Sequence, residues 1–467
     1  MATLGPATDR PGVLREVIAA GVDVVRLNAS HSTREELKRR LDAVREIARG
    51  LDRPLATLLD LQGPKIRVGR LPAGGVELKP GEPCVLATAA DRCPPGAVPV
   101  DYEPLAREVA PGNVVLIDDG NLALRVEATD GSTIRCRVER GGTLTSRKGI
   151  NVPGAPISAP ALTAKDVADA ALGVAEGVDF LALSFVRRAD DVARLREHAG
   201  GGAVIAKIER PEALGEIEAI LAAADGIMVA RGDLGVEVPL EQVPGIQRDL
   251  LRAANRAGKP AITATQMLES MVERPRPTRA EATDVYVAVA QLTDAVMLSA
   301  ETAIGAYPVE AVRAMAAIAA AADAQTDFLG VSRAAADVAR GATEAVAQAA
   351  CQMAAELGVK AIVTSTSSGS TPRAVARYRP QVPVVALVHD AGVRRRLALT
   401  WGIVALAAPR FRSTDEMLAT AAQKVVEAGF AGQGDLVVIT AGVPLGTPGH
   451  TNLIKVHRLG DPVTSGL

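Results

Sequence analysis

The chain has 467 residues, of which 48% are apolar and 23% charged, with a net charge of −2. This length predicts about two to four domains, and the apolar content argues against disorder. The balanced charge and the 2% of aromatic residues argue against a nucleic-acid binder, which needs a basic face and stacking rings. The balanced charge also gives no reason to expect binding to an anionic membrane surface. No apolar run reaches the ~18 residues of a membrane span.

The cysteines and the first residues predict the compartment. The four cysteines are widely spaced and form no C-x-x-C pair; they are Cys84, Cys93, Cys136 and Cys351. Neither a zinc site nor a disulfide framework is therefore expected, and a reducing environment fits. The first residues, Met1 to Pro6, lack the basic and apolar regions of a signal peptide. A cytoplasmic protein is expected, with neither a nucleic acid nor a membrane as partner.

Short apolar runs alternate with amphipathic helical patterns over roughly the first 300 residues. The runs predict eight strands, near Ala2–Leu4, Val22–Leu27, Leu55–Leu59, Phe180–Leu183, Val204–Ala206, Gly226–Ala230, Ala261–Ala264 and Ala295–Leu298. Helices are expected at Arg34–Arg49, Thr163–Glu176, Ala189–His198, Pro211–Ala223 and Pro308–Ala322. Continuous apolar strands separated by helices indicate a parallel sheet covered on both faces. Eight such units predict a closed (β/α)8 barrel, the TIM barrel of the α/β class.

Two further domains are expected. Residues 69–158 alternate with period two and carry Asp-Gly turns at Asp119-Gly120 and Asp130-Gly131, which predicts an all-β cap domain inserted after the third strand. There it would stand over the active-site face as a lid. Beyond about residue 330, strands and helices alternate again and predict an open α/β domain. The predicted division is a barrel of residues 1–68 and 159–330, a cap of 69–158 and a C-terminal domain of 331–467.

Functional side chains cluster where the predicted barrel strands end. Catalytic residues of such barrels lie at the carboxyl ends of the strands. Polar and charged groups follow six of the eight strands; these segments are Arg26–His31, Asp60–Arg67, Lys207–Glu209, Arg231–Gly235, Thr265-Gln266 and Ser299–Glu301. Any one of them alone would be read as an ion pair, a turn or a helix cap. Their joint occurrence at one face predicts an active site.

The central pair of this site is predicted to bind a metal. Lys207 and Glu209 are two residues apart on a strand, so they project to the same face. Asp233 follows the adjacent strand, and two carboxylates without histidine or cysteine suit a hard cation such as Mg²⁺. Cations around Mg²⁺, here Arg26, Arg67 and Lys207, are typical of phosphoryl transfer. The chain contains neither a P-loop motif nor a G-x-G-x-x-G dinucleotide motif.

Together these segments resemble the pyruvate kinase family. The longest matching runs are Met228–Gly235, Ala264–Met271 and Pro275–Glu281, and shorter matches extend over essentially the whole chain. The resemblance implies the same three-domain plan. It implies a glycolytic phosphotransferase that moves phosphate from phosphoenolpyruvate to ADP, giving pyruvate and ATP. It also implies a cytoplasmic, allosteric homotetramer that uses Mg²⁺ or Mn²⁺.

The resemblance also implies roles for individual residues. Glu209 and Asp233 match the metal ligands, Lys207 the lysine that stabilises the phosphoryl group in flight, and Arg26 the arginine that holds the substrate phosphate. The substrate carboxylate is expected near Gly232, Asp233 and Thr265. The proton path to the enolate carbon is expected at Thr265 and Ser299. The nucleotide-binding positions are Arg67, Lys148, His31 and Pro6.

One departure from the family pattern concerns a monovalent cation. Many members have Thr-Lys and then Glu where this chain has Leu61-Gln62 and Lys65, and they require K⁺. Their K⁺ ligands match Asn28, Ser30, Asp60 and the carbonyl of Leu61. An ammonium group at position 65 supplies a positive charge of its own. We therefore hypothesise that catalysis does not require K⁺.

The C-terminal domain carries a hydroxyl-rich loop after its first predicted strand; its residues are Thr366, Ser367, Ser368, Gly369, Ser370 and Thr371. Hydroxyl and backbone N–H groups form phosphate pockets, and in the family the matching loop binds phosphorylated effectors. The alternative is an ordinary serine-rich turn. Two alternatives to the function also stay open. They are another Mg²⁺-enolate barrel enzyme acting on pyruvate or phosphoenolpyruvate, and a catalytically silent regulatory homologue.

Overall fold

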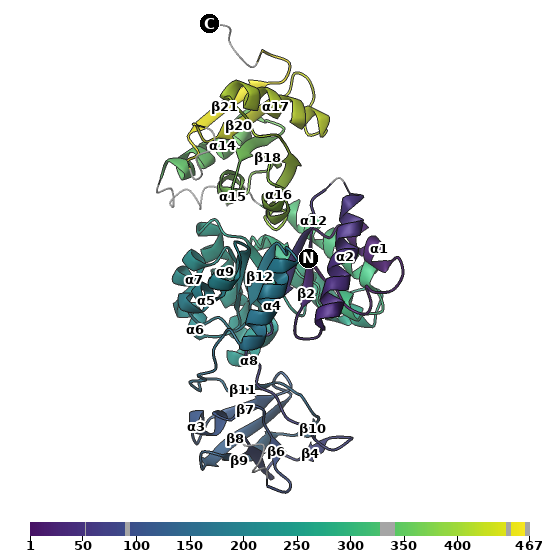
Figure 1. The fold of residues 1–467 in the computed structure, drawn as a ribbon, viewed down its shortest axis with the longest axis vertical. Helices are drawn as coiled ribbons and strands as arrows, with labels where there is room; N and C mark the ends of the chain where they lie inside the picture. The colour runs from purple at the N-terminus through teal and green to yellow at the C-terminus, as the bar shows by residue number, and fades with distance from the viewer. Residues whose placement is uncertain (52, 89–93, 327–340, 445–449, 463–467) are drawn as a thin grey trace.

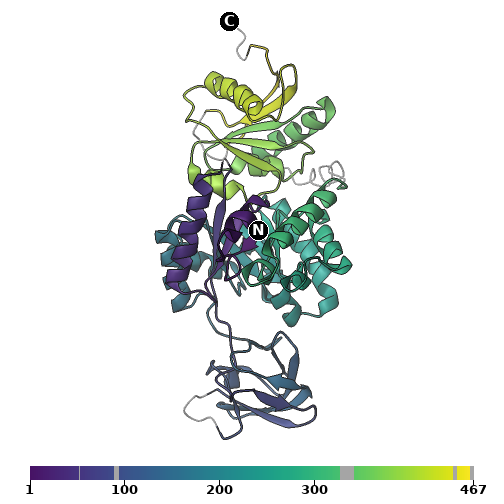
Figure 2. The same ribbon diagram turned by 90° about the vertical axis from the view of Figure 1, so that its right-hand side faces the viewer.

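The computed structural model describes the chain except residues 52, 89–93, 327–340, 445–449 and 463–467. The barrel lies in the middle, with the cap at one end and the C-terminal domain at the other (Figures 1 and 2). Cys93 and the predicted boundary at 330/331 lie outside the described residues.

The barrel strands run in parallel and in chain order, so the predicted TIM barrel is confirmed. They are β1 (Ala2–Thr3), β2 (Val24–Asn28), β3 (Ala56–Asp60), β12 (Phe180–Leu183), β13 (Ala203–Ile208), β14 (Gly226–Ala230), β15 (Ala261–Ala264) and β16 (Ala295–Val296). A parallel bridge between Ala2 and Leu298 joins the first strand to the segment after the last. The strands are continuously apolar because both of their faces are buried. Leu58 points into the interior cluster and its neighbour Leu59 into the helix-covered outer cluster.

Helices surround the barrel strands, on the outside and at the end that faces the cap. They are α1 (Val13–Ala19), α2 (Arg34–Arg49), α4 (Ala164–Ala175), α5 (Ala189–His198), α6 (Glu212–Gly215), α7 (Ile217–Ala223), α8 (Arg231–Glu237), α9 (Val243–Arg256), α10 (Arg279–Ala290), α11 (Ala300–Ala303) and α12 (Pro308–Asp323). Capping boxes begin α2, α4 and α10. The single helix predicted at Pro211–Ala223 is two, because the backbone leaves helical geometry at Glu216, directly after Gly215. Among the described residues, no helix has the length and apolar character needed to cross a bilayer.

The cap is all-β apart from one short helix, α3 (Leu105–Glu108). Its strands are β4 (Val76–Leu78), β5 (Pro83–Ala87), β6 (Val98–Pro99), β7 (Val114–Ile117), β8 (Leu122–Thr129), β9 (Thr133–Arg140), β10 (Gly142–Leu144) and β11 (Ile150–Asn151). The outgoing and returning segments pair at the barrel's edge, where the N–H of Val68 donates to the carbonyl of Lys148 at 2.8 Å. This pairing makes the hinge between cap and barrel.

The C-terminal domain is an open sheet flanked by helices, as predicted. Its strands are β17 (Ile362–Thr366), β18 (Val384–Val388), β19 (Ile403–Ala407), β20 (Leu436–Ala441) and β21 (Leu453–Arg458), in the order β19-β18-β17-β20-β21 with β21 antiparallel. Its helices are α14 (Ala342–Leu357), α15 (Ser370–Ala376), α16 (Ala391–Leu397) and α17 (Thr414–Glu427).

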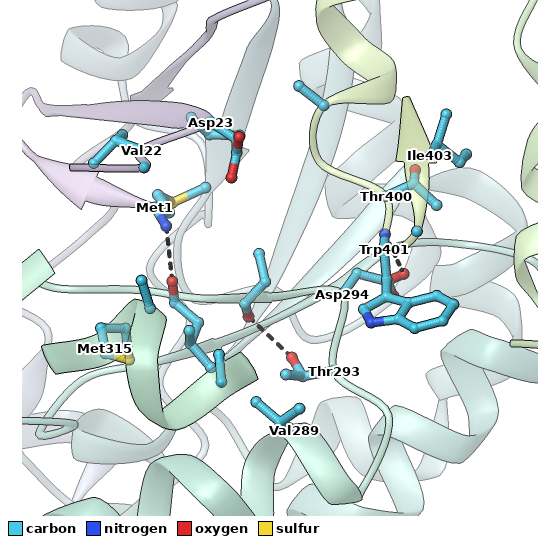
Figure 3. Close-up of a pocket in the computed structure, with 18 of the residues that line it drawn as sticks. Met1, Val22, Asp23, Val289, Thr293, Asp294, Met315, Thr400, Trp401 and Ile403 are labelled. Carbon is cyan, nitrogen blue, oxygen red and sulfur yellow. Dashed lines mark hydrogen bonds between the residues drawn. The ribbon is translucent and has the colours of Figure 1, made fainter. Parts of the chain in front are cut away.

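A buried polar cluster joins this domain to the amino-terminal end of the barrel. The guanidinium of Arg379 lies 3.2 Å from the carboxylate of Asp294 and stacks over the ring of Trp401 at 4.8 Å. The indole of Trp401 donates to Asp323 at 3.2 Å. A cavity of about 590 Å³ lies between the two domains and is lined from both sides, with Met1 and Asp23 facing Trp401 across it (Figure 3).

Candidate active site

Five neighbouring strands bring the predicted residues to one end of the barrel. In the sheet order β3-β12-β13-β14-β15, the strands end at or near Asp60, Ser184, Lys207, Asp233 and Thr265. This is the carboxyl end, and it faces the cap (Figure 1). Side chains that are far apart in sequence therefore meet because parallel strands end at the same edge.

Lys207 lies at the centre of these groups. Its ammonium is 2.7 Å from the Glu209 carboxylate and 3.3 Å from that of Asp60, and it donates to the Ser184 hydroxyl at 2.8 Å. Burial alone would lower the pKa of Lys207, but the two carboxylates raise it above its ordinary value. The lysine therefore keeps its charge in a buried site, where a positive charge acts strongly on an anion.

Asp60 couples this lysine to Arg26. The Nε and Nη2 atoms of Arg26 both lie 2.7 Å from Oδ2 of Asp60, and its Nη1 donates to Thr3 at 3.0 Å. Burial would raise the pKa of Asp60, but Lys207 and Arg26 together lower it. Asp60 is thus an ionised anchor that fixes two cations side by side.

Glu209 and Asp233 have the character of a metal pair. Glu209 is almost fully buried, and burial and Asp233 raise its pKa above the ordinary value. Asp233 lies in the first turn of α8 and remains 27% exposed. A divalent cation between them would relieve the repulsion of the two carboxylates. Within the described residues, no group of three or more His, Cys, Asp or Glu side chains could hold a metal, so such a cation would need substrate oxygens and water as further ligands.

Thr265 follows β15 in a strained backbone conformation. Its φ is +69°, and that of Gln266 is +51°, values that non-glycine residues rarely adopt. The Thr265 hydroxyl accepts the N–H of Gly232 at 2.7 Å, and Arg231 donates to the Thr265 carbonyl at 2.7 Å. The turn is therefore held against the start of α8, beside Asp233.

Lys65 approaches the metal pair from the loop after β3. Its ammonium lies 3.5 Å from Oδ1 of Asp233. The loop turns sharply at Gly63, where φ is +68° and a Cβ would be 2.6 Å from the Phe185 ring. The N–H of Gly63 donates to Asp166, which begins α4, at 3.1 Å. Glycine is therefore required here if Lys65 is to reach the site.

Three of the four positions that match K⁺ ligands already have protein partners. The Leu61 carbonyl accepts the Ser184 hydroxyl at 2.7 Å, and the Asn28 side chain accepts the N–H of Ser30 at 3.0 Å. The Asp60 carboxylate forms ion pairs with Arg26 and Lys207.

The predicted nucleotide residues lie around the hinge and at neighbouring strand ends. Lys148 forms an ion pair with Asp118 of the cap at 2.7 Å, and Arg67 donates to the carbonyl of Arg147 at 3.0 Å. The His31 residue is exposed overall. Partial burial of its imidazole lowers its pKa, and nearby cations, of which Arg67 has the largest effect, lower it further. The remaining two predicted residues, Pro6 and Ser299, follow β1 and β16. In the part of the chain that the structure describes, no hydrogen bond or ion pair joins them or His31 to the Lys207 cluster.

The hydroxyl-rich loop lies in the C-terminal domain, far from these residues (Figure 1). The Thr366 hydroxyl accepts the N–H of Gly369 at 2.8 Å, and Arg373 donates to the carbonyl of Ser368 at 3.1 Å. A cavity of about 810 Å³ opens beside the loop toward the barrel, and five of its lining residues are cationic: Arg196, Lys259, Arg373, Arg377 and Arg396.

Sequence reasoning missed the contribution of the fourth barrel strand. Ser184 binds Lys207 and the Leu61 carbonyl, and the N–H of Phe185 donates to Glu209 at 2.8 Å. Both residues directly follow β12, so the rule that identified the other strand ends would also have found them. They carry no charge, and for that reason the segment was recognised only as a match to the family and not as part of the site.

Two family models match the chain. "Pyruvate kinase, barrel domain" matches residues 1–312, and "Pyruvate kinase, alpha/beta domain" matches residues 344–457. Among curated proteins, the pyruvate kinase of Geobacillus stearothermophilus is 46% identical over 472 residues, which cover 99% of this chain and 80% of the relative. Those of Sporosarcina psychrophila and Staphylococcus aureus (strain MRSA252) are 43% and 42% identical with the same coverage.

Proposed function

Because the chain belongs to the pyruvate kinase family, we propose that the cluster around Lys207 is the centre that carries out its reaction. The chain is a phosphotransferase that converts phosphoenolpyruvate and ADP into pyruvate and ATP. The observation that carries the assignment of the centre is the buried, charged Lys207 held between Asp60, Glu209 and Ser184.

The substrate phosphoryl group would be held by Arg26 and Lys207. Asp60 keeps these two cations in place, and together with Glu209 it keeps Lys207 charged. A phosphoryl group in transfer carries charge on its equatorial oxygens, so fixed cations lower the barrier by positioning and charge stabilisation. Removing one charged partner of the site should therefore cost turnover more than substrate binding.

Glu209 and Asp233 would hold the divalent cation, Mg²⁺ or Mn²⁺. When bound, that cation supplies charge stabilisation for the substrate oxygens and for the enolate oxygen left after transfer. Gly232, Asp233 and Thr265 would surround the substrate carboxylate. The enolate must then gain a proton at carbon, and Thr265 and Ser299 are proposed to lie on that path.

ADP would enter under the cap. Lys148 comes from the cap side of the hinge and Arg67 from the outgoing segment, so cap movement would bring these cations to the nucleotide phosphates. His31 and Pro6 complete the proposed nucleotide surface. A closed cap also excludes water, which would otherwise compete with ADP for the phosphoryl group.

We also propose that K⁺ is dispensable. Two observations support this. The Lys65 ammonium lies 3.5 Å from the Asp233 carboxylate. The Leu61 carbonyl and the Asn28 side chain already accept hydrogen bonds from Ser184 and Ser30. The Lys65 side chain thus supplies the positive charge that a bound K⁺ would bring to the site.

The loop from Thr366 to Thr371 is proposed to bind the phosphate of an effector, with the cationic cavity beside it as support. Titrating sugar phosphates and AMP against activity tests this, and no response to any of them would leave an ordinary turn. A homotetramer is also proposed, to be checked by light scattering. A cytoplasmic location is proposed because the three described cysteines are free and buried, as a reducing compartment allows.

One assay tests the proposed function against both alternatives. Phosphoenolpyruvate, ADP and Mg²⁺ are supplied, and pyruvate and ATP are measured separately. Equal amounts of both products are expected. Consumption of phosphoenolpyruvate without ATP formation would favour another enolate enzyme, and no consumption of phosphoenolpyruvate would favour a silent homologue. The presence of Arg26, Lys207, Glu209, Asp233 and Thr265 together supports an active enzyme.

A further inference from the structure

A side chain of the cap is bonded to a helix of the active site. Asn151, at the end of β11, donates its amide to Oε1 of Glu237 at 2.8 Å. Glu237 is the last residue of α8, and Arg210 donates to the same oxygen at 2.7 Å. Glu237 and Arg210 are both buried, whereas Asn151 is only half-buried. A neutral donor from the cap therefore meets a carboxylate that the barrel holds firmly.

Both barrel partners of this contact lie close to the metal pair along the chain. Arg210 is the residue after Glu209. Glu237 is four residues beyond Asp233 on α8, so the two side chains lie on the same helical face. In Figure 1, α8 lies between the barrel and the cap, next to β11. Movement of the cap that displaces Glu237 would therefore act one helical turn from Asp233.

The cap partner is equally close to the nucleotide residues. Asn151 is three residues after Lys148, and the segment that holds both pairs with Ile66 and Val68 in the hinge. Arg187 also binds the returning segment, at the carbonyls of Ile157 and Ala159, but these lie farther along the chain, toward the barrel. The amide of Asn151 is therefore well placed to set how Lys148 faces the metal pair.

The Glu237 carboxylate can accept a further hydrogen bond. Oε1 of Glu237 carries two donors, whereas Oε2 is buried and, in the described part of the chain, has no hydrogen-bond partner. A buried acceptor without a partner is unfavourable. A small rotation of the cap would let the amide pass from Oε1 to Oε2, so the contact can persist while the cap turns.

We propose that Glu237 and Asn151 form a latch that sets the position of the cap during phosphoryl transfer, with Arg210 holding the carboxylate in place. Glu237 is in this view a positioning residue: it acts on ADP through Lys148 and touches no reacting atom. The proposal rests on the proposed function, in which Lys148 binds the nucleotide, and adds the contact that fixes the cap.

The first test is Asn151→Ala, with Thr143→Ala as the matched control. Thr143 donates to Glu77 at 2.9 Å, a neutral-donor bond to a carboxylate that stays inside the cap. For Asn151→Ala we expect kcat/KM for ADP to fall about tenfold, in line with one hydrogen bond to a charged group. The KM for phosphoenolpyruvate and the affinity for Mn²⁺ without nucleotide should stay within about twofold, because barrel residues determine both. Thr143→Ala should change none of these values.

The second test reverses the hydrogen bond. Asn151→Asp places two carboxylates together and should lower kcat/KM for ADP further, by about 100-fold, since like charges in contact repel. Adding Glu237→Gln gives a donor on the barrel side and should restore most of the loss, a coupling that a double-mutant cycle measures. The latch is refuted if Asn151→Ala leaves ADP kinetics unchanged, if Mn²⁺ affinity falls in parallel, or if the double variant is no better than Asn151→Asp.

Discussion

Replacing Lys65 by methionine tests how the site obtains its extra positive charge. The Lys65 ammonium and the Asp233 carboxylate are 3.5 Å apart and are 29% and 27% exposed. At an effective dielectric constant of about 20, Coulomb's law gives roughly 5 kcal/mol at this distance, as an upper bound. Water reaches both groups, so about half of that should remain. A similar energy acting on the phosphoryl group in transfer would make the loss roughly 2.7 kcal/mol in the transition state, or about 100-fold in turnover.

The assay is steady-state turnover with phosphoenolpyruvate, ADP and Mg²⁺ in a buffer whose only monovalent cation is tetramethylammonium. The unmodified chain should keep its activity there. Lys65→Met should lose about 100-fold and regain part of it when K⁺ is added, because K⁺ can replace the missing charge. Lys79→Met, which removes an exposed cap lysine, is the control for net charge. The reasoning fails if the unmodified chain itself collapses about 100-fold without K⁺ and Na⁺, or if Lys65→Met is fully active.

Two further predictions concern stability. Arg379→Met leaves Asp294 buried without its cation, so it should lower the free energy of unfolding by about 3–5 kcal/mol, and adding Asp294→Asn should recover part of this. A melting temperature equal to that of the unmodified chain would contradict it. Asp9→Asn removes the carboxylate whose pKa the Arg40 hydrogen bond lowers. Because a lowered pKa stabilises the fold above the ordinary value and the effect is lost as pH falls, the variant should be less stable by about 1 kcal/mol near pH 7 and equal to the unmodified chain once the pH is below the lowered pKa. A difference that does not shrink in acid would show that the carboxylate's charge is not the cause.

The centre of the site could be predicted from sequence because its geometry follows from strand period alone. Lys207 and Glu209 are two residues apart at the end of one strand, so their common direction needs no knowledge of the rest of the fold. Asp233 and Thr265 follow from the rule that parallel strands end at one edge. Asp60 was assigned only to a K⁺ position, although the structure also makes it the anchor of Arg26 and Lys207.

Other features depend on contacts that no local pattern encodes. Ser184 contributes a hydroxyl rather than a charge, so its role appears only when Lys207 lies within 2.8 Å. The break between α6 and α7 was missed because the amphipathic pattern continues across Gly215. The contact between Asn151 and Glu237 joins segments 86 residues apart and depends on how the inserted cap sits on the barrel. Orientation between domains is set by such contacts and not by secondary-structure propensity.

The most direct test of the central claim is Lys207→Ala, followed by ³¹P NMR of ATP formation from phosphoenolpyruvate and ADP with Mg²⁺. Circular dichroism would confirm that the barrel is still folded. Lys207 is the one cation in contact with both Asp60 and Glu209 within the described ranges, so its loss removes the charge that stabilises the phosphoryl group. The expected result is a folded protein whose ATP formation falls by at least about 1,000-fold, or roughly 4 kcal/mol. A folded variant that makes ATP at the rate of the unmodified chain would contradict the role assigned to Lys207.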